Sequence, residues 1–334
     1  MTGIDRSCGR GAALKKFPFF LPFAGCRGQC VYCNQRAITG ALSVPSPDDV
    51  RRALKKLTAP REICYFGGSF CRFPKDTVKE YLDAVTEAAP AGSTVRFSTY
   101  PGDLSDDAMR ALIKSYPVSR IELGIPSLDP AVLASCRREA DPDKILGDIA
   151  VMMKDSLPVG VQMMIGLPGQ SRESSIRDME KLAALKKNDI WDMRLYPCLV
   201  ITGTELERMW RIGCYKPLSV FEAALWGGEF IDRAVELGFV PIRIGLQETE
   251  SLASEAVAGP HHPALGELIL ADAEARRLVR CSHDGPWHVQ RRFISRFTGH
   301  GRFGVKRIAE YAAIPESEAG RRIIFESSES APNY

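Results

Sequence analysis

The sequence predicts an α/β fold, in which six parallel strands and the helices between them form a partial barrel that is followed by an α-rich C-terminal extension. Short apolar segments alternate with segments of helical periodicity. The expected strands start 26 to 45 residues apart, close to the roughly 30 residues of a strand–helix–strand unit. Parallel strands joined by crossover helices close into a barrel or partial barrel, whose functional residues lie at the carboxyl ends of the strands.

Hydrophobic runs bounded by turn residues predict six strands, at 17–21, 62–66, 94–98, 120–125, 159–165 and 193–196. Helical periodicity and N-cap signals predict helices between them, at 48–57, 75–88, 105–115, 142–155 and 171–187. After the last strand, two more helices are expected, at 205–211 and 219–237. These elements divide the chain into a lead-in, a barrel with flanking helices and a C-terminal extension, at 1–16, 17–247 and 248–334.

The composition fits a soluble globular protein of one large or two ordinary domains, with 334 residues, 45% of them hydrophobic and 25% charged. The formal charge is only +3, so nucleic-acid binding would need a local basic patch. No apolar run approaches the roughly 18 residues that cross a bilayer, so we expect no membrane partner. Three of the ten cysteines lie within eight residues, which predicts a metal site in a reducing, cytoplasmic location.

The three clustered cysteines, Cys26, Cys30 and Cys33, follow directly after the first predicted strand. Thiolates are the usual ligands of iron–sulfur clusters, and three of them on a tight loop can bind three irons of a 4Fe-4S cluster and leave the fourth open. Alternatives are a zinc site, which would need a fourth ligand, and three unrelated buried cysteines. The aromatic Tyr32 just before the last cysteine and the position at a strand end favour the cluster.

In these residues the sequence resembles the radical SAM superfamily, whose signature is Cys-x-x-x-Cys-x-aromatic-Cys. It is also similar to the radical SAM half of the Elongator catalytic subunit, and in particular to short bacterial elongator protein 3-like proteins. The similar segments are 20–26, 33–35, 66–70, 122–124, 162–169, 196–197 and 203–206.

The resemblance implies a radical SAM enzyme with a partial (β/α)6 barrel. A 4Fe-4S cluster on the three cysteines would take one electron from a reductant such as ferredoxin or flavodoxin. It would cleave S-adenosylmethionine (SAM) to methionine and a 5'-deoxyadenosyl radical. The substrate is unknown, and RNA, including tRNA, is a candidate.

The resemblance also implies the residues around SAM, which are Tyr32, Gly67, Gly68, Ser69, Ser98, Arg137, Gln162 and Gly166. The turn 67–69 would hold the amino group of the methionine moiety, Ser98 would face SAM, and Gln162 would reach the ribose hydroxyls. Gly166 would permit contact with adenine, and Arg137 would pair with the SAM carboxylate. From the residues alone, plain turns and a polar residue inside the barrel explain these glycines and Gln162 equally well.

Three positions depart from the family pattern. Tyr100 stands where many relatives have arginine, Pro126 where glutamine is usual, and Glu139 where relatives have histidine. Each lost polar contact is worth on the order of 1 kcal/mol when desolvated. The alternative function is therefore an iron–sulfur protein that has lost radical chemistry and serves in RNA binding or redox sensing.

The segment 276–307 carries nine lysines and arginines against one acidic residue, Asp284. Four aromatic residues interleave with these charges, which are Trp287, Phe293, Phe297 and Phe303. This composition suits phosphate contact and base stacking, so one interpretation is RNA or tRNA binding. The other is a solvated helical face whose apolar side packs on the barrel. Only 87 residues follow Gln247, fewer than the roughly 100 of a typical domain, so we expect no acetyltransferase activity.

Overall fold

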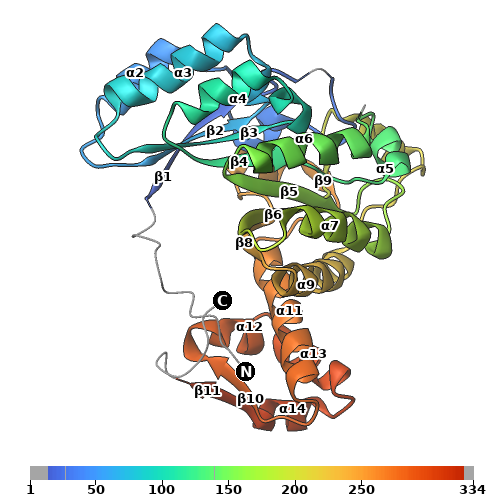
Figure 1. Cartoon of the computed structure of the whole chain (residues 1–334). Coiled ribbons are helices and arrows are strands. Elements are labelled where there is room, and N and C mark those ends of the chain that lie inside the picture. Colours follow the sequence, from blue (N-terminus) through green and yellow to red (C-terminus); the bar gives the residue numbers. More distant parts are fainter. Residues whose placement is uncertain (1–13, 27, 139, 327–334) are drawn as a thin grey trace.

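The computed structural model describes residues 14–26, 28–138 and 140–326 (Figure 1). Most of the predicted lead-in 1–16 and the departure at Glu139 therefore lie outside the described residues. The fold is organised around a curled half-barrel sheet of seven parallel strands, in the order β1-β2-β3-β4-β5-β6-β8. The strands are β1 (Lys16–Leu21), β2 (Glu62–Gly67), β3 (Thr94–Thr99), β4 (Val118–Gly124), β5 (Val159–Ile165), β6 (Trp191–Pro197) and β8 (Phe239–Ile244).

The six predicted strands are confirmed, each within two residues of its expected bounds. The seventh strand, β8, was not predicted. It contains Pro241, and a proline inside an apolar run argues against a central strand because it lacks the N–H that the ladder needs. β8 lies at the edge of the sheet, beside β6 on one side only, and there the missing donor is tolerated. The barrel is open between the two edge strands, β1 and β8.

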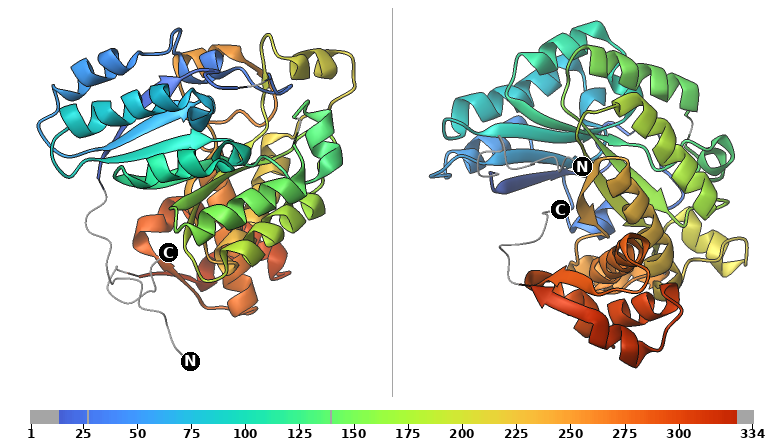
Figure 2. Two further views of the ribbon diagram at one scale, coloured as in Figure 1. Left: turned by 45° about the horizontal axis from the view of Figure 1, so that its top comes forward. Right: turned by 60° about the horizontal axis from the view of Figure 1, so that its bottom comes forward.

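Crossover helices cover the outer face of the sheet (Figure 2). They are α2 (Pro47–Leu54), α3 (Lys75–Ala88), α4 (Asp107–Lys114), α6 (Pro142–Lys154) and α7 (Arg172–Lys186). Ser46 and Ser171 cap α2 and α7 through capping boxes. In each box the cap hydroxyl accepts a hydrogen bond from the backbone N–H of the third helical residue, and the side chain of that residue accepts one from the backbone N–H of the cap. Shorter elements in the connections are α1 (Gln35–Thr39), η1 (Phe70–Arg72), η2 (Pro101–Leu104), α5 (Pro130–Ser135), β7 (Val200–Ile201), α8 (Glu205–Arg211), α10 (Glu250–Glu255) and β9 (Ala256–Ala258).

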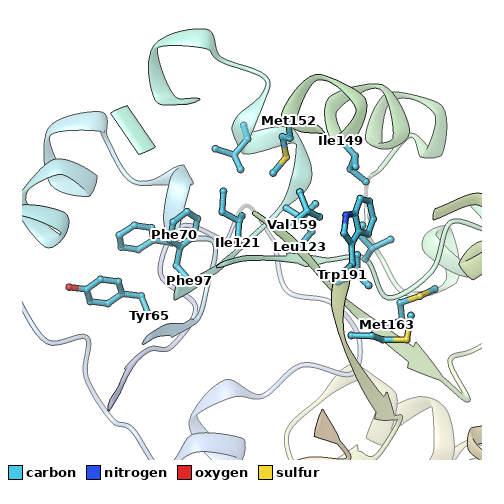
Figure 3. Packing of buried hydrophobic residues seen from close by; sticks show 14 of the residues in the cluster. Tyr65, Phe70, Phe97, Ile121, Leu123, Ile149, Met152, Val159, Met163 and Trp191 are labelled. Carbon is cyan, nitrogen blue, oxygen red and sulfur yellow. The ribbon is translucent and has the colours of Figure 1, made fainter. Parts of the chain in front are cut away.

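The main hydrophobic core fills the space between the sheet and these helices (Figure 3). Phe97, Ile121 and Val159 from neighbouring strands are fully or almost fully buried in it. Met152 and Ile149 of α6 pack over the same strands. Because the apolar side chains of the strands face outward to the helices, the inner face of the sheet is left for polar residues.

The C-terminal part forms a second, smaller core. Helix α11 (Leu265–Cys281) packs against α9 (Val220–Glu236). The first half of α11 contributes to the barrel core and its second half, from Ala275 on, to the smaller core. The elements that complete it are β10 (Trp287–Gln290), η3 (Arg291–Phe293), α12 (Ile294–Thr298), α13 (Phe303–Tyr311), α14 (Glu316–Arg322) and β11 (Ile323–Glu326). The extension is thus α-rich, but it also contains the parallel pair β10–β11. None of the helices described is long and apolar enough to cross a membrane.

Candidate active site

A cavity of about 1170 Å³ opens at the carboxyl ends of the barrel strands. It is lined by Cys26, Cys30 and Cys33 together with seven of the eight residues that the sequence placed around SAM, namely Tyr32, Gly67, Gly68, Ser69, Ser98, Arg137 and Gln162. Gly166 is not among its lining residues. The Gly166 carbonyl accepts a hydrogen bond from Tyr215 Oη at 2.7 Å, and an added Cβ would lie 2.8 Å from Leu218 Cδ1. The Gly166 turn therefore packs against the segment that leads into α9.

The cysteine loop begins where β1 ends and is held against the turn after β2. Gly68 N donates to Leu21 O at 2.9 Å, and Ser69 N donates to Ala24 O at 2.7 Å. A Cβ on Gly68 would lie 1.7 Å from Ala24 O, and one on Gly25 would lie 2.2 Å from Ser69 O. Only glycine allows two backbone segments to come this close. The Gly67-Gly68 turn thus fixes the cysteine loop, a role that the sequence reasoning did not assign to it.

The three thiols have different surroundings. Cys26 is exposed and lies 4.0 Å from Gln35 Nε2, while Cys30 is half-buried and lies 3.7 Å from Arg138 Nη1. Burial raises the pKa of Cys33 to about 12, and the neighbouring Cys30 adds to this effect. A thiolate at Cys33 therefore needs a strong positive charge, such as iron, to be stable.

The donor set fits a 4Fe-4S cluster better than a single ion. Among the residues that the structure describes, no group of three or more His, Cys, Asp or Glu side chains is arranged to hold one metal ion. A cluster does not require such convergence, because each thiolate binds a different iron atom. Three soft sulfur donors on one loop, beside a cavity with room for a ligand, are the set that an open-site cluster needs.

The hydroxyl of Ser69 is engaged by the chain itself. It donates to the Asp103 carboxylate and accepts from Tyr100 N at 2.8 Å. Arg72 pairs with the same carboxylate. The Ser69 hydroxyl and the backbone N–H groups of Gly68 and Ser69 are therefore all engaged by the chain itself.

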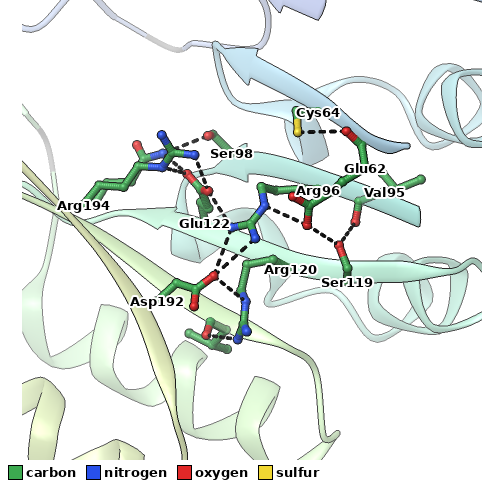
Figure 4. A network of polar contacts seen from close by, with 12 residues as sticks. Glu62, Cys64, Val95, Arg96, Ser98, Ser119, Arg120, Glu122, Asp192 and Arg194 are labelled. Atoms are coloured by element: carbon green, nitrogen blue, oxygen red, sulfur yellow. Dashed lines mark hydrogen bonds and ion pairs between the residues drawn. The ribbon is translucent and has the colours of Figure 1, made fainter. Parts of the chain in front are cut away.

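The floor of the cavity is a buried ionic network (Figure 4). Glu122 is 1% exposed and accepts hydrogen bonds from Arg96 Nη1 at 2.8 Å and from Gln162 Nε2 at 2.7 Å. Arg194 Nε lies 2.6 Å from the same carboxylate. Gln162 also donates to Ser98 Oγ at 3.0 Å. Gln162 and Ser98 thus lie side by side above a network that holds them in place.

Two adjacent arginines after α5 have different positions. Arg137 is on the surface, with 63% of its side chain exposed, and pairs with Glu205 at 2.9 Å. Arg138 points into the cavity, where its Nη2 donates to Gly124 O at 2.6 Å. The backbone of Arg137 has a left-handed φ of 51°, which turns the chain so that the two side chains diverge. Both arginines line the cavity. The sequence analysis named only Arg137, since no pattern in one sequence distinguishes two neighbouring arginines, and the pairing of Arg137 with the SAM carboxylate stays a prediction.

Two family models match most of the chain. The model described as the radical SAM superfamily matches residues 20–183, and the model of the Radical_SAM C-terminal domain matches residues 190–277. The chain belongs to the radical SAM superfamily. The members of this superfamily are enzymes, and the predicted family and fold class are both confirmed.

Individual relatives of this radical SAM protein match half to two thirds of the chain. A tRNA uridine(34) acetyltransferase from Methanocaldococcus infernus is 30% identical over 248 residues, which is 67% of this chain and 45% of that protein. A tRNA-2-methylthio-N(6)-dimethylallyladenosine synthase from Clostridium botulinum is 27% identical over 180 residues, 50% of this chain and 39% of that protein. The chain thus spans less than half the length of either relative.

The fold is also similar to a solved structure, that of the archaeal Methanocaldococcus infernus Elp3 with an N-terminal deletion. The TM-score is 0.59 at 20% sequence identity, and the match covers 85% of this chain and 68% of that one. This likeness shows a shared fold.

Two of the three departures from the radical SAM pattern line the cavity, Tyr100 and Pro126. The ring of Tyr100 contacts two guanidinium groups, with its centroid 5.5 Å from Arg72 Cζ and 5.3 Å from Arg138 Cζ. An added Cβ on Gly102 would lie 2.7 Å from Tyr100 Cε1, so Gly102 leaves room for the ring. The departure at Tyr100 thus places an aromatic ring in contact with Arg72 and Arg138, which come from other parts of the chain.

The basic segment 276–307 is largely neutralised in the folded protein. Within the described residues, at least six of its nine cations form ion pairs with acidic residues, and these are Arg276, Arg277, Arg280, Arg296, Arg302 and Arg307. Trp287 and Phe297 are 1% and 0% exposed in the smaller core, so the expectation that they stack on bases is wrong. The apolar side of the segment packs chiefly within the extension, and not on the barrel as the other interpretation had it.

Proposed function

We propose that this protein holds a 4Fe-4S cluster on Cys26, Cys30 and Cys33, binds SAM beside it, and uses the pair for radical chemistry. The observation that carries the proposal is that one cavity of about 1170 Å³ is lined by all three cysteines, by the turn 67–69 and by Gln162. When bound, the cluster and SAM supply one-electron reductive cleavage of SAM to methionine and a 5'-deoxyadenosyl radical. The electron would come from a reductant of the ferredoxin or flavodoxin class, in the cytoplasm.

The chain's own residues would bind and orient these groups. The backbone of Gly67 and Gly68 lies at the cavity wall, where C=O groups can approach a ligand closely. Gln162 and Ser98 offer an amide and a hydroxyl that are already oriented by Glu122. The half-buried Tyr32 and the buried floor network restrict water at the inner end of the cavity. A dry, polar-lined site is what a reactive radical requires.

We propose RNA, and tRNA in particular, as the substrate. Of the seven lysines and arginines in the cavity lining, Arg72, Arg137 and Arg194 pair with carboxylates. The other four are Lys16, Arg138, Lys144 and Arg243, and positive charge of this kind attracts phosphate groups. Lys16 on β1 and Arg243 on β8 belong to this lining and lie on the two edge strands. The names of the two relatives above, a tRNA acetyltransferase and a tRNA methylthio-adenosine synthase, support the same substrate class.

The test is anaerobic reconstitution with iron and sulfide, reduction, addition of SAM and chromatographic assay of 5'-deoxyadenosine, with and without tRNA. We expect product from the native protein and none after joint replacement of Cys26, Cys30 and Cys33 by alanine. Replacement of the exposed Cys214 and Cys281 by alanine is the matched control and should leave the product yield unchanged. Product that persists without the three cysteines would refute the proposal. A cluster that assembles but yields no product even with tRNA would favour the alternative, an iron–sulfur protein without radical chemistry.

A further inference from the structure

The guanidinium of Arg138 directly contacts a sulfur atom of the cysteine loop. Its Nη1 lies 3.7 Å from Cys30 Sγ and its Nη2 donates to Gly124 O at 2.6 Å. A guanidinium carries its charge at every physiological pH and presents its donors in a fixed fork. One arm of this fork is fixed to the end of β4, and the other faces the sulfur.

None of the carboxylates that the structure describes pairs with Arg138. Arg72, Arg137 and Arg194, which line the same cavity, pair with Asp103, Glu205 and Glu122 respectively. Within the described part of the chain no carboxylate lies within ion-pair distance of Arg138, and its partners are a sulfur, a carbonyl and an aromatic ring. Arg138 therefore brings to Cys30 a positive charge that is not paired with any of the described carboxylates.

Tyr100 keeps the guanidinium in this position. The Arg138 Cζ lies 5.3 Å from the centroid of the Tyr100 ring, within the range of a cation–π contact. The ring is fixed in turn, because Tyr100 N donates to Ser69 Oγ at 2.8 Å and Gly102 leaves space for it. Tyr100, a departure from the family pattern, thus connects the turn after β2 to the arginine beside Cys30.

We propose that Arg138 raises the reduction potential of the cluster through its contact with Cys30, and that Tyr100 is the residue that positions it. The inference rests on the proposed function, because it requires a cluster on the three cysteines. Reduction adds one electron to the cluster, and a nearby cation with a hydrogen bond to a sulfur ligand stabilises that added charge. Arg138 would thus make the cluster easier for a biological reductant to reduce.

The experiment is a redox titration of the reconstituted protein without SAM, followed by the electron paramagnetic resonance signal of the reduced cluster. In Arg138→Gln we expect the ratio of reduced to oxidised cluster at a fixed solution potential to fall about tenfold, a shift of about 59 mV for one electron. Arg138→Lys keeps the charge but loses the two-armed guanidinium, so its reduction potential should shift less than that of Arg138→Gln. Tyr100→Phe keeps the ring and should match the native protein, whereas Tyr100→Ala should shift in the direction of Arg138→Gln.

The matched control is Arg211→Gln, which removes one positive charge from α8, where Arg211 is exposed and paired with Glu207. It should leave the potential unchanged. An intact cluster with native potential in Arg138→Gln would overturn the inference while the proposed function stood. If Arg138→Gln fails to assemble a cluster, the test passes to Tyr100→Ala. A native reduction potential in Tyr100→Ala would then overturn the inference that Arg138 and Tyr100 together raise the potential. Failure of the native protein to bind any cluster would overturn the proposed function, and this inference with it.

Discussion

The cysteine loop and the basic segment 276–307 were both identified by residues that lie close together in the chain, but folding preserves this grouping only in the cysteine loop. Cys26, Cys30 and Cys33 are close in the chain, and in the fold they stay together at one cavity. The charges of 276–307 are also close in the chain, yet their acidic partners include Asp232 and Glu236, which come from α9. Short spacings on a loop persist in three dimensions, whereas a local count of charges does not predict the surface, because distant segments supply the counter-charges.

The strongest way to sharpen this comparison is to remove a counter-charge from the extension. Asp272 is 0% exposed and lies 2.7 Å from both Arg276 Nε and Arg307 Nε. In Asp272→Asn two partly or fully buried guanidinium groups lose their buried anion and keep only the more exposed Glu229 and Glu310, so we expect the free energy of unfolding to fall by about 3 kcal/mol. Urea denaturation followed by circular dichroism measures this. Asp284→Asn, at an exposed carboxylate, should change it by less than about 0.5 kcal/mol.

A change in the cysteine loop should act on cluster binding as well as stability. Gly68→Ala would place a Cβ 1.7 Å from Ala24 O, so the loop and the turn after β2 must move apart. We expect a loss of about 2 kcal/mol in unfolding free energy and a loss of iron bound after reconstitution. Gly28→Ala, on the same loop with nothing within 4 Å of the added atom, should bind iron normally. Equal iron content in the two variants would contradict this account of the loop.

RNA binding distinguishes the two regions directly. If the cavity is the RNA site, joint replacement of Lys16 and Arg243 by glutamine should weaken tRNA binding and lower the salt slope of log K by about 1 for each lost phosphate contact. Joint replacement of Arg291 and Lys306, exposed cations of the extension, should change the affinity by no more than about twofold. Fluorescence anisotropy at several salt concentrations measures both. A larger loss from the extension variant would place the RNA contact there instead.

The smallest effect is expected at an exposed pair of the extension. Arg302 Nη1 lies 3.4 Å from Glu316 Oε1, and the Arg302 side chain is half exposed. Solvent screens such pairs, so Arg302→Gln should lower the unfolding free energy by no more than about 0.5 kcal/mol. A loss of unfolding free energy comparable to that of Asp272→Asn would contradict the expectation that buried ion pairs stabilise this segment more than exposed ones.

The errors of the sequence-based predictions share a cause. Residues 159–165 and 75–88 were predicted with the bounds that the structure has, because apolar periodicity and helix-start signals are local. β8 was missed because Pro241 excludes a central strand, and only the assembled sheet shows that β8 is an edge. One of the two interpretations of 276–307 placed its aromatic residues at a surface, although Trp287 and Phe297 form a core, since composition does not say which side of an element is covered.

The sequence by itself determined the family, the strand–helix alternation and the three cysteines, because each depends on residues near one another in the chain. The tertiary structure decided which arginine contacts the cysteine loop, which glycine this loop requires and which charges are neutralised. Arg138 contacts Cys30 across 108 residues, and Gly68 meets Ala24 across the first two strands. Such contacts arise only when parallel strands bring their carboxyl ends to one edge, and a single sequence carries no signal for the pairing of distant residues.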